Sequence, residues 1–124
     1  MPLTNTPEWL ALKAHADDLA GQHLRDLFAN DAQRFERLSR LGLNLYFDFS
    51  RQRLTEETIR LLAKLADARG LHSRIDAMFA GEKINTTENR AVLHTALRNR
   101  GDRPVLVDGQ DVMPEERARL DKKR

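Results

Sequence analysis

The sequence contains no cysteine, and it has only four prolines and six glycines among its 124 residues. Without cysteine, a disulfide framework and a thiolate metal site are both excluded. Aromatic residues make up 6% of the chain, and no apolar run approaches the roughly 20 residues that span a bilayer. The first residues also lack the basic segment and apolar run of a secretory signal. We therefore expect a cytoplasmic protein that makes no membrane contact.

Neither sign of charge is in strong excess, since 21 Lys and Arg stand against 19 Asp and Glu. Residues 1–114 contain 16 charges of each sign, and the last ten contain five basic and three acidic residues. A nucleic-acid-binding domain usually concentrates basic residues on its folded body. The neutral body argues against nucleic-acid binding. A weak binder that uses Arg90, Arg98 and the basic tail remains the least favoured alternative.

The length and the composition, with 40% apolar and 32% charged residues, are typical of one domain. We therefore expect residues 1–124 to form a single unit with one modest core. A chain of this size buries roughly two-thirds of the surface that its unfolded form exposes. If it is part of a larger protein, some of its apolar faces should lie uncovered.

Helical spacing of apolar residues dominates the sequence and predicts a mainly α fold. Thr6 and Thr55 are suited to cap the helices that follow them, and Gly70 is suited to end the second of these. A break near Asn30 and Asp31 would divide one long stretch, with Asp31 capping its second half. Helices are predicted over residues 7–20, 23–40, 56–69, 71–79 and 88–100, and from 114 onward.

Two places favour short strands. Apolar residues alternate with polar ones from Leu43 to Phe49, which predicts a half-buried strand. Asp108-Gly109 is a dipeptide typical of tight hairpin turns, so a small hairpin is expected over 104–112. The charged residues 115–124 are expected to form a truncated helix that frays at its end.

Five phrases of the sequence resemble one protein family. They are DLFA at 26–29, DFSRQR at 48–53, TEET at 55–58, MFAG at 78–81 and GEKINTTENRAVLHTALRNRGDRPVLVDGQDVMP at 81–114. Phrases like these occur in the same order in the amino-terminal part of phosphoglucose isomerase (glucose-6-phosphate isomerase). The sequence therefore resembles the amino-terminal segment of that family over nearly its whole length.

The resemblance implies the amino-terminal part of an α/β sugar-isomerase-type enzyme that interconverts glucose 6-phosphate and fructose 6-phosphate. It implies a homodimer that uses neither a metal nor an organic cofactor. In this family the acid, base and phosphate-binding residues lie beyond the region matched here, so no catalytic residue is assigned to this segment. The segment alone is expected to be inactive, and its partner is the carboxy-terminal remainder of the same enzyme. A free-standing helical interaction module is the alternative.

One basic group within the resembling block is a candidate for the substrate pocket. Arg90, His94 and Arg98 are spaced by four residues, which would align them on one face of the helix predicted over 88–100. His94 is the pocket-proximal candidate. The competing interpretation, which we favour, is that both arginines pair with carboxylates and that His94 is a packing residue. The other histidines are scattered, and their spacing predicts no metal site.

Overall fold

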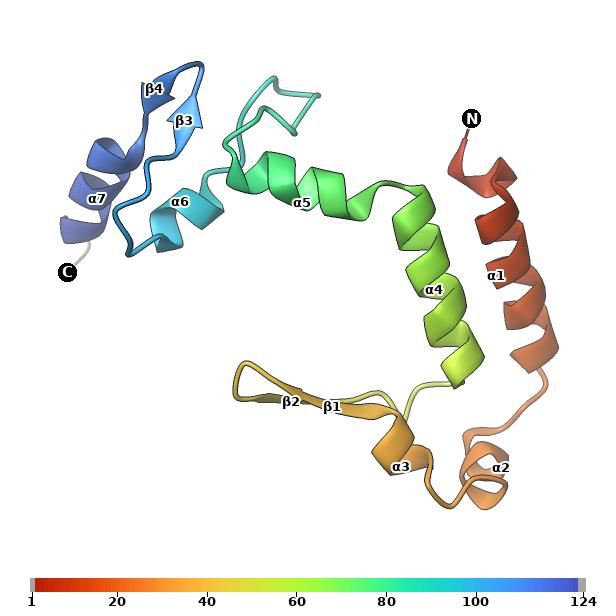
Figure 1. Cartoon of the computed structure of the whole chain (residues 1–124). Helices are drawn as coiled ribbons and strands as arrows, with labels where there is room; N and C mark the ends of the chain where they lie inside the picture. Colours follow the sequence, from red (N-terminus) through yellow and green to blue (C-terminus); the bar gives the residue numbers. More distant parts are fainter. Residues whose placement is uncertain (1, 123–124) are drawn as a thin grey trace. The chain divides into compact units, whose positions relative to one another are not determined.

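The computed structural model describes residues 2–122. The chain divides into two compact units, and the boundary along the chain lies between Arg69 and Gly70. Figure 1 colours them from red to light green and from green to blue. The first unit contains α1 (Pro7–Leu19), α2 (Leu24–Ala29), α3 (Arg34–Arg37), β1 (Ser39–Gly42), β2 (Leu45–Asp48), α4 (Glu56–Ala68) and the 3-10 turn η1 (Leu3–Asn5). The second contains α5 (Leu71–Phe79), α6 (His94–Arg98), β3 (Leu106–Val107), β4 (Gln110–Asp111) and α7 (Met113–Asp121). The predicted mainly helical fold with a few short strands is confirmed.

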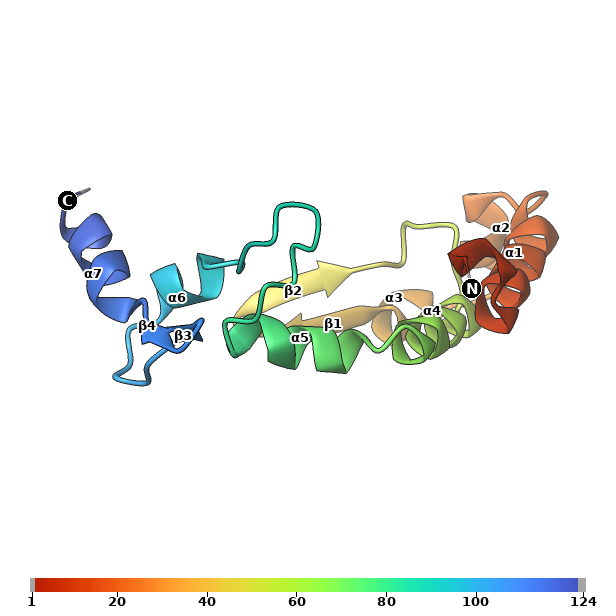
Figure 2. The ribbon, with the colours of Figure 1, turned by 90° about the horizontal axis from the view of Figure 1, so that it is seen from above.

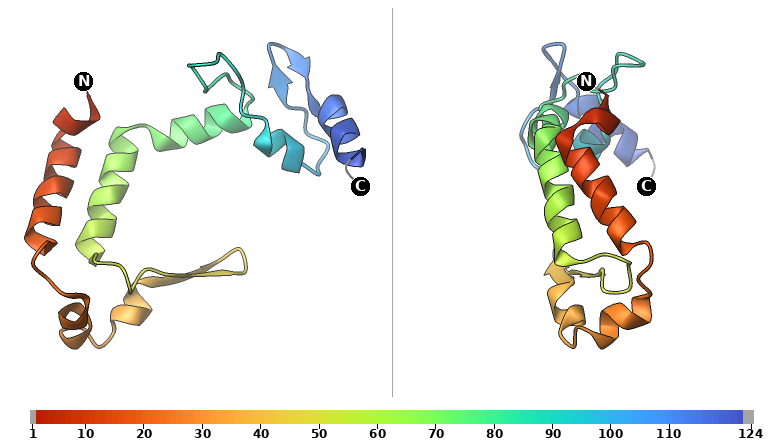
Figure 3. Two further views of the ribbon diagram at one scale, coloured as in Figure 1. Left: turned by 180° about the vertical axis from the view of Figure 1, so that it is seen from behind. Right: turned by 90° about the vertical axis from the view of Figure 1, so that its right-hand side faces the viewer.

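Helices α1 and α4 lie side by side in the first unit (Figure 3). Each begins where the sequence predicts a cap: the Trp9 amide donates to the Thr6 hydroxyl at 3.3 Å, and Thr55 forms a capping box with Thr58. Such caps satisfy amide groups that the first turn of a helix leaves without partners. Leu19 of α1 and Leu61 of α4 are the buried apolar residues of the pair.

The stretch predicted as a helix over 23–40 is divided into α2 and α3, as the Asn30-Asp31 pair suggested. Asp31 does not cap α3, however, because the N-cap residue is Gln33. The Asp31 carboxylate instead accepts the Gln33 amide at 3.1 Å, which is a local turn rather than a helix start. The end of the predicted helix is also wrong, since Ser39 and Arg40 belong to β1.

Strands β1 and β2 form an antiparallel hairpin, with Ser39 opposite Asp48 and Gly42 opposite Leu45. The strand predicted from Leu43 therefore begins two residues later. Leu43 and Asn44 form the turn with φ of 52° and 61°, the left-handed values of a two-residue type I′ turn. Figure 2 shows the two strands as adjacent arrows that extend away from the helices of the first unit.

The second unit has a small core of Ala96, Val105 and Met113, which are 1%, 8% and 2% exposed. The hairpin predicted at 104–112 is confirmed as β3 and β4, joined through Asp108-Gly109. Helix α7 has a proline in its first turn, as predicted. It extends to Asp121, and the last two residues of the predicted fraying tail lie outside the described residues.

The helix predicted over 88–100 is wrong in its first half. Asn85 and Arg90 exchange both backbone hydrogen bonds, at 3.2 and 3.1 Å, and close a loop. Asn89 within this loop has a φ of 52°, which a right-handed helix cannot accommodate. The Asn85 side chain accepts a hydrogen bond from the Glu88 amide at 3.3 Å and donates one to the Glu88 carboxylate at 3.2 Å, and both stabilise this turn. Only α6, from His94 to Arg98, is helical.

Gly81 is held where no other residue fits, and this gives a test of the second unit. Its φ is 82°, and a methyl group on its Cα would lie 2.5 Å from the backbone carbonyl oxygen of Leu106. We expect Gly81→Ala to lower the free energy of unfolding by roughly 2–4 kcal/mol, because both strain and the backbone clash oppose it. Urea unfolding followed by far-UV circular dichroism measures this change.

The matched control is Gly21→Ala. No φ constraint applies at Gly21, and no atom lies within 4 Å of the added methyl group. We expect this variant to unfold at the same urea concentration as the wild-type chain, or slightly higher. Equal behaviour of the two variants would show that the loop at Gly81 does not pack against β3.

Candidate functional site

The predicted pocket residue, His94, begins α6 with an exposed side chain. It lines two neighbouring cavities of about 430 and 500 Å³. Leu93 and Arg119 line both of them, so α6 and α7 together form their shared wall. No hydrogen bond joins the His94 ring to another residue of the described chain. The imidazole is therefore accessible, but nothing in residues 2–122 orients it for proton transfer.

The three residues predicted to share one helical face do not do so. Arg90 lies in the loop before α6, and its guanidinium is 3.9 Å from the Glu88 carboxylate. Arg98 does share α6 with His94, and it donates to the His94 backbone carbonyl at 3.1 Å. Arg90 thus pairs with a carboxylate, as the favoured interpretation expected, whereas Arg98 donates to a backbone carbonyl and the His94 side chain is exposed.

Two other cations around these cavities, Arg119 and Lys83, are paired with carboxylates. Arg119 donates to Glu116 at 2.6 Å, and the Glu116 side chain is only 6% exposed. Lys83 pairs with Asp108 at 2.7 Å. A phosphate group would have to compete with these carboxylates for the same donors. The cavities beside His94 are thus not preorganised as an anion site by the described residues.

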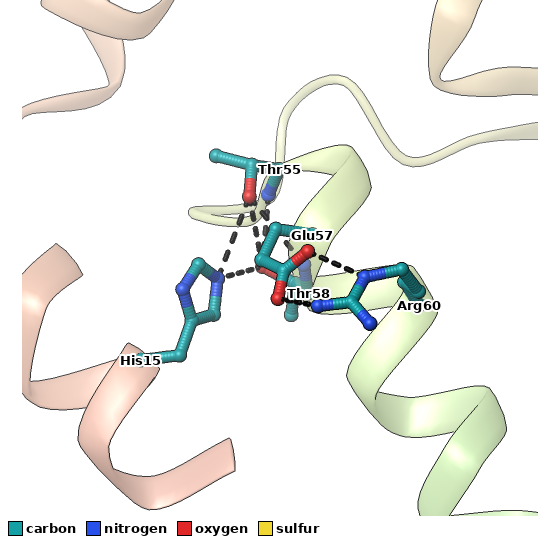
Figure 4. Close-up of polar contacts among 5 residues, drawn as sticks. All are labelled: His15, Thr55, Glu57, Thr58 and Arg60. Atoms are coloured by element: carbon teal, nitrogen blue, oxygen red, sulfur yellow. Dashed lines mark hydrogen bonds and ion pairs between the residues drawn. The ribbon is translucent and has the colours of Figure 1, made fainter. Parts of the chain in front are cut away.

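A second polar cluster joins α1 to the first turn of α4 (Figure 4). The His15 Nε2 atom lies 2.7 Å from the Thr58 hydroxyl and 3.4 Å from that of Thr55. Beside it, Arg60 Nε donates to Glu57 at 2.6 Å. This hydrogen bond from Arg60 keeps the pKa of the Glu57 carboxyl below its usual range, and the His15 ring contributes in the same direction. The cluster aligns two helices, and a cavity of about 200 Å³ adjoins His15 and Thr58.

The most buried charge of the first unit is the guanidinium of Arg34, whose residue is 3% exposed. Its Nε donates to the Ser50 carbonyl at 2.9 Å. Its Nη2 donates to the carbonyls of Gln52 and Leu54 at 2.8 and 2.9 Å. The cation also lies 5.5 Å from the centre of the Phe28 ring. Arg34 therefore fixes the loop between β2 and α4.

A cavity of about 370 Å³ adjoins Arg34 and is lined by charges of both signs. Arg37 and Asp31 form an ion pair in its wall. The hydrogen bond from Arg37 holds the pKa of the Asp31 carboxyl below its usual range. Within residues 2–122 there is no group of three or more metal-ligating side chains. In the same range no helix is long and apolar enough to cross a membrane.

Comparison with known proteins shows which family this chain belongs to. The sequence profile of phosphoglucose isomerase matches residues 48–124. The chain belongs to the phosphoglucose isomerase family. Among its relatives, the glucose-6-phosphate isomerase of Anaeromyxobacter sp. (strain K) is 60% identical over 98% of the chain. Those of Methylococcus capsulatus and Deinococcus deserti are 54% and 59% identical over 98% and 91% of it.

The chain spans only 22% of the Anaeromyxobacter and Methylococcus isomerases and 21% of that from Deinococcus. The predicted resemblance to phosphoglucose isomerase, covering nearly the whole sequence, is thereby confirmed. His94 and the loop before it fall within the part that the family profile matches. The role of His94 in a substrate pocket stays a prediction.

Sequence reasoning missed both polar networks of the first unit. Arg34 was one of many charged residues in a helical stretch, and its acceptors are 16 to 20 residues away. His15 is 43 residues from Thr58. The spacing of His15 could have indicated a packed position. It lies three residues after Leu12 and four before Leu19, on the apolar side of α1.

Proposed function

We propose that this chain is a structural segment of a glucose-6-phosphate isomerase, the enzyme that interconverts glucose 6-phosphate and fructose 6-phosphate. The supporting observation is 60% identity over 98% of the chain to an enzyme of which the chain spans 22%. In the complete enzyme, the segment packs against the catalytic domains of a cytoplasmic homodimer. The partner that it requires is the rest of the isomerase polypeptide.

The chemistry of the reaction supports a structural role for this segment. Aldose–ketose isomerisation requires a base of suitable pKa, stabilisation of a developing oxyanion and a site for the phosphate group. Residues 2–122 bring no such set together. The His94 ring has no acid or base within hydrogen-bonding distance, and Arg119 and Lys83 beside it are paired with carboxylates. The catalytic groups therefore belong to the remainder of the enzyme.

His94 keeps a specific place in this proposal. It is exposed, it lines two cavities and it lies in the segment that the family profile matches. We propose that the remaining polypeptide adds the other walls of a substrate pocket near His94. The histidine would then contribute a hydrogen bond at the edge of that pocket rather than serve as the central base.

The isolated chain should have no isomerase activity. In an assay that couples fructose 6-phosphate conversion to glucose 6-phosphate dehydrogenation, we expect the rate with residues 1–124 to equal the rate with buffer. The complete Anaeromyxobacter enzyme at the same molar concentration serves as the positive control. Turnover by the purified chain that rises with its concentration would contradict the proposal.

A further inference from the structure

The hairpin of β1 and β2, together with Phe49, is here called the β-tongue (residues 39–49). Large apolar side chains lie on both of its faces. Leu45, Phe47 and Phe49 alternate along one face, and they are 58%, 44% and 39% exposed. Leu41 and Tyr46 are cross-strand partners on the other face, and they are 76% and 58% exposed.

Little within the first unit covers either face. The rings of Phe47 and Phe49 stack on each other at 6.3 Å. Tyr46 contacts the Phe35 ring of α3 at 6.1 Å, but Phe35 is itself 46% exposed. A two-stranded hairpin is only marginally stable in water by itself. The β-tongue thus needs apolar surface on both sides, which a groove provides and a flat surface does not.

The tip of the β-tongue gives an independent indication. Leu43 has a φ of 52° and is 97% exposed. The first central position of a type I′ turn favours Asn, Asp or Gly, and a leucine there is strained as well as exposed. The folding of the hairpin therefore does not explain a leucine at this position. A contact between the Leu43 side chain and another surface would explain it.

The remaining polypeptide of the isomerase is the occupant that fits best. About four-fifths of the relatives' length lies outside this segment, since the segment spans 22% of that length. A second copy of the segment fits less well, because each of the four cavities described above has a charged side chain in its wall. The β-tongue itself contains only two charges, Arg40 and Asp48.

We propose that the β-tongue inserts into an apolar groove of the remaining isomerase polypeptide, with Leu43 as the anchor at its tip. This inference rests on the proposed function and adds the surface through which the segment is held. Because the anchor opposes the local preference of the turn, removing it should affect folding and association in opposite directions.

The test is a binding titration with Leu43→Asn. The partner is the Anaeromyxobacter isomerase lacking the segment that matches residues 1–124, and fluorescence anisotropy of the labelled chain reports binding. Asparagine suits the left-handed turn, so the isolated variant should keep the circular dichroism of the wild-type chain. Its affinity should nevertheless fall roughly 10- to 100-fold, the loss that burial of one leucine side chain predicts.

Leu43→Met is the matched control, since it keeps an apolar side chain at the tip. We expect it to bind within about threefold of the wild-type affinity. Wild-type binding together with equal binding of Leu43→Asn would overturn the role of the β-tongue and leave the proposed function intact. Failure of the wild-type chain to bind this partner, once circular dichroism shows the partner to be folded, would overturn both. Self-association of the wild-type chain that Leu43→Asn abolishes, without binding to the partner, would identify a second copy as the occupant and overturn the inference.

Discussion

Replacing Arg34 with methionine is expected to release the loop between β2 and α4 and to lower the free energy of unfolding by about 3–5 kcal/mol. The guanidinium supplies the three hydrogen bonds that hold the carbonyls of Ser50, Gln52 and Leu54. Methionine fills a similar volume but leaves these carbonyls without their donor in a site where Arg34 is 3% exposed. Urea unfolding measured by far-UV circular dichroism gives the change.

Trypsin digestion provides a local measurement of the same effect. The loop contains Arg51 and Arg53, both exposed, and trypsin cleaves after each once the backbone is free to enter its active site. Cleavage at these two positions should be faster in Arg34→Met. The cleavage rate of Arg34→Lys should fall between the rates of the wild-type chain and of Arg34→Met, because one ammonium group cannot reproduce the planar fork of a guanidinium.

Arg25→Met is the control for the loss of a positive charge and for the added apolar side chain. Arg25 is an exposed residue of α2 in the same unit. We expect this variant to change the free energy of unfolding by less than about 0.5 kcal/mol. If Arg34→Met were equally mild, the guanidinium would not be what holds the loop.

The helices that the sequence predicted well are those with both a strong period and clear end signals. Thr6 caps α1, Thr55 caps α4, and Gly70 separates α4 from α5 with a φ of 65°. These signals act within one turn of the residues that they affect, so a local pattern is sufficient.

Two elements could not be predicted because their determinants are not local. The sequence of β1, Ser-Arg-Leu-Gly, does not alternate in polarity, and it is a strand because β2 pairs with it. The helix predicted over 88–100 has good apolar spacing from Val92 onward. Its first part is nevertheless a loop, because of the Asn85–Arg90 backbone pair and the left-handed conformation of Asn89. Pairing and turn geometry override the period here.

The same distinction applies to the candidate site. His94 could be selected because it lies in a phrase that resembles the family, whereas its cavities required the packing of α6 against α7. The Arg34 and His15 networks connect residues too far apart in the sequence for a pattern to reveal. Helix α4 is also informative, because its apolar residues Ile59 and Leu62 are 42% and 44% exposed.

Helix α4 and the β-tongue both expose large apolar side chains. Few apolar side chains of the described residues are buried: Leu19, Leu38, Leu61, Ala96, Val105 and Met113. Large apolar residues are exposed on α4 and on both faces of the hairpin. Patches of this kind are typical of surfaces that pack against another polypeptide. We propose that the rest of the isomerase polypeptide covers these patches.

Reconstitution of activity from two polypeptides tests this conclusion most directly. The chain of 124 residues is mixed with the Anaeromyxobacter isomerase lacking the matching segment, and fructose 6-phosphate conversion is followed in the coupled assay. We expect each polypeptide alone to be inactive and the mixture to convert substrate at a rate that saturates with added chain. A companion polypeptide that is fully active alone, or an inactive mixture in which both polypeptides are folded and bound, would contradict the assignment of this chain as a required structural segment.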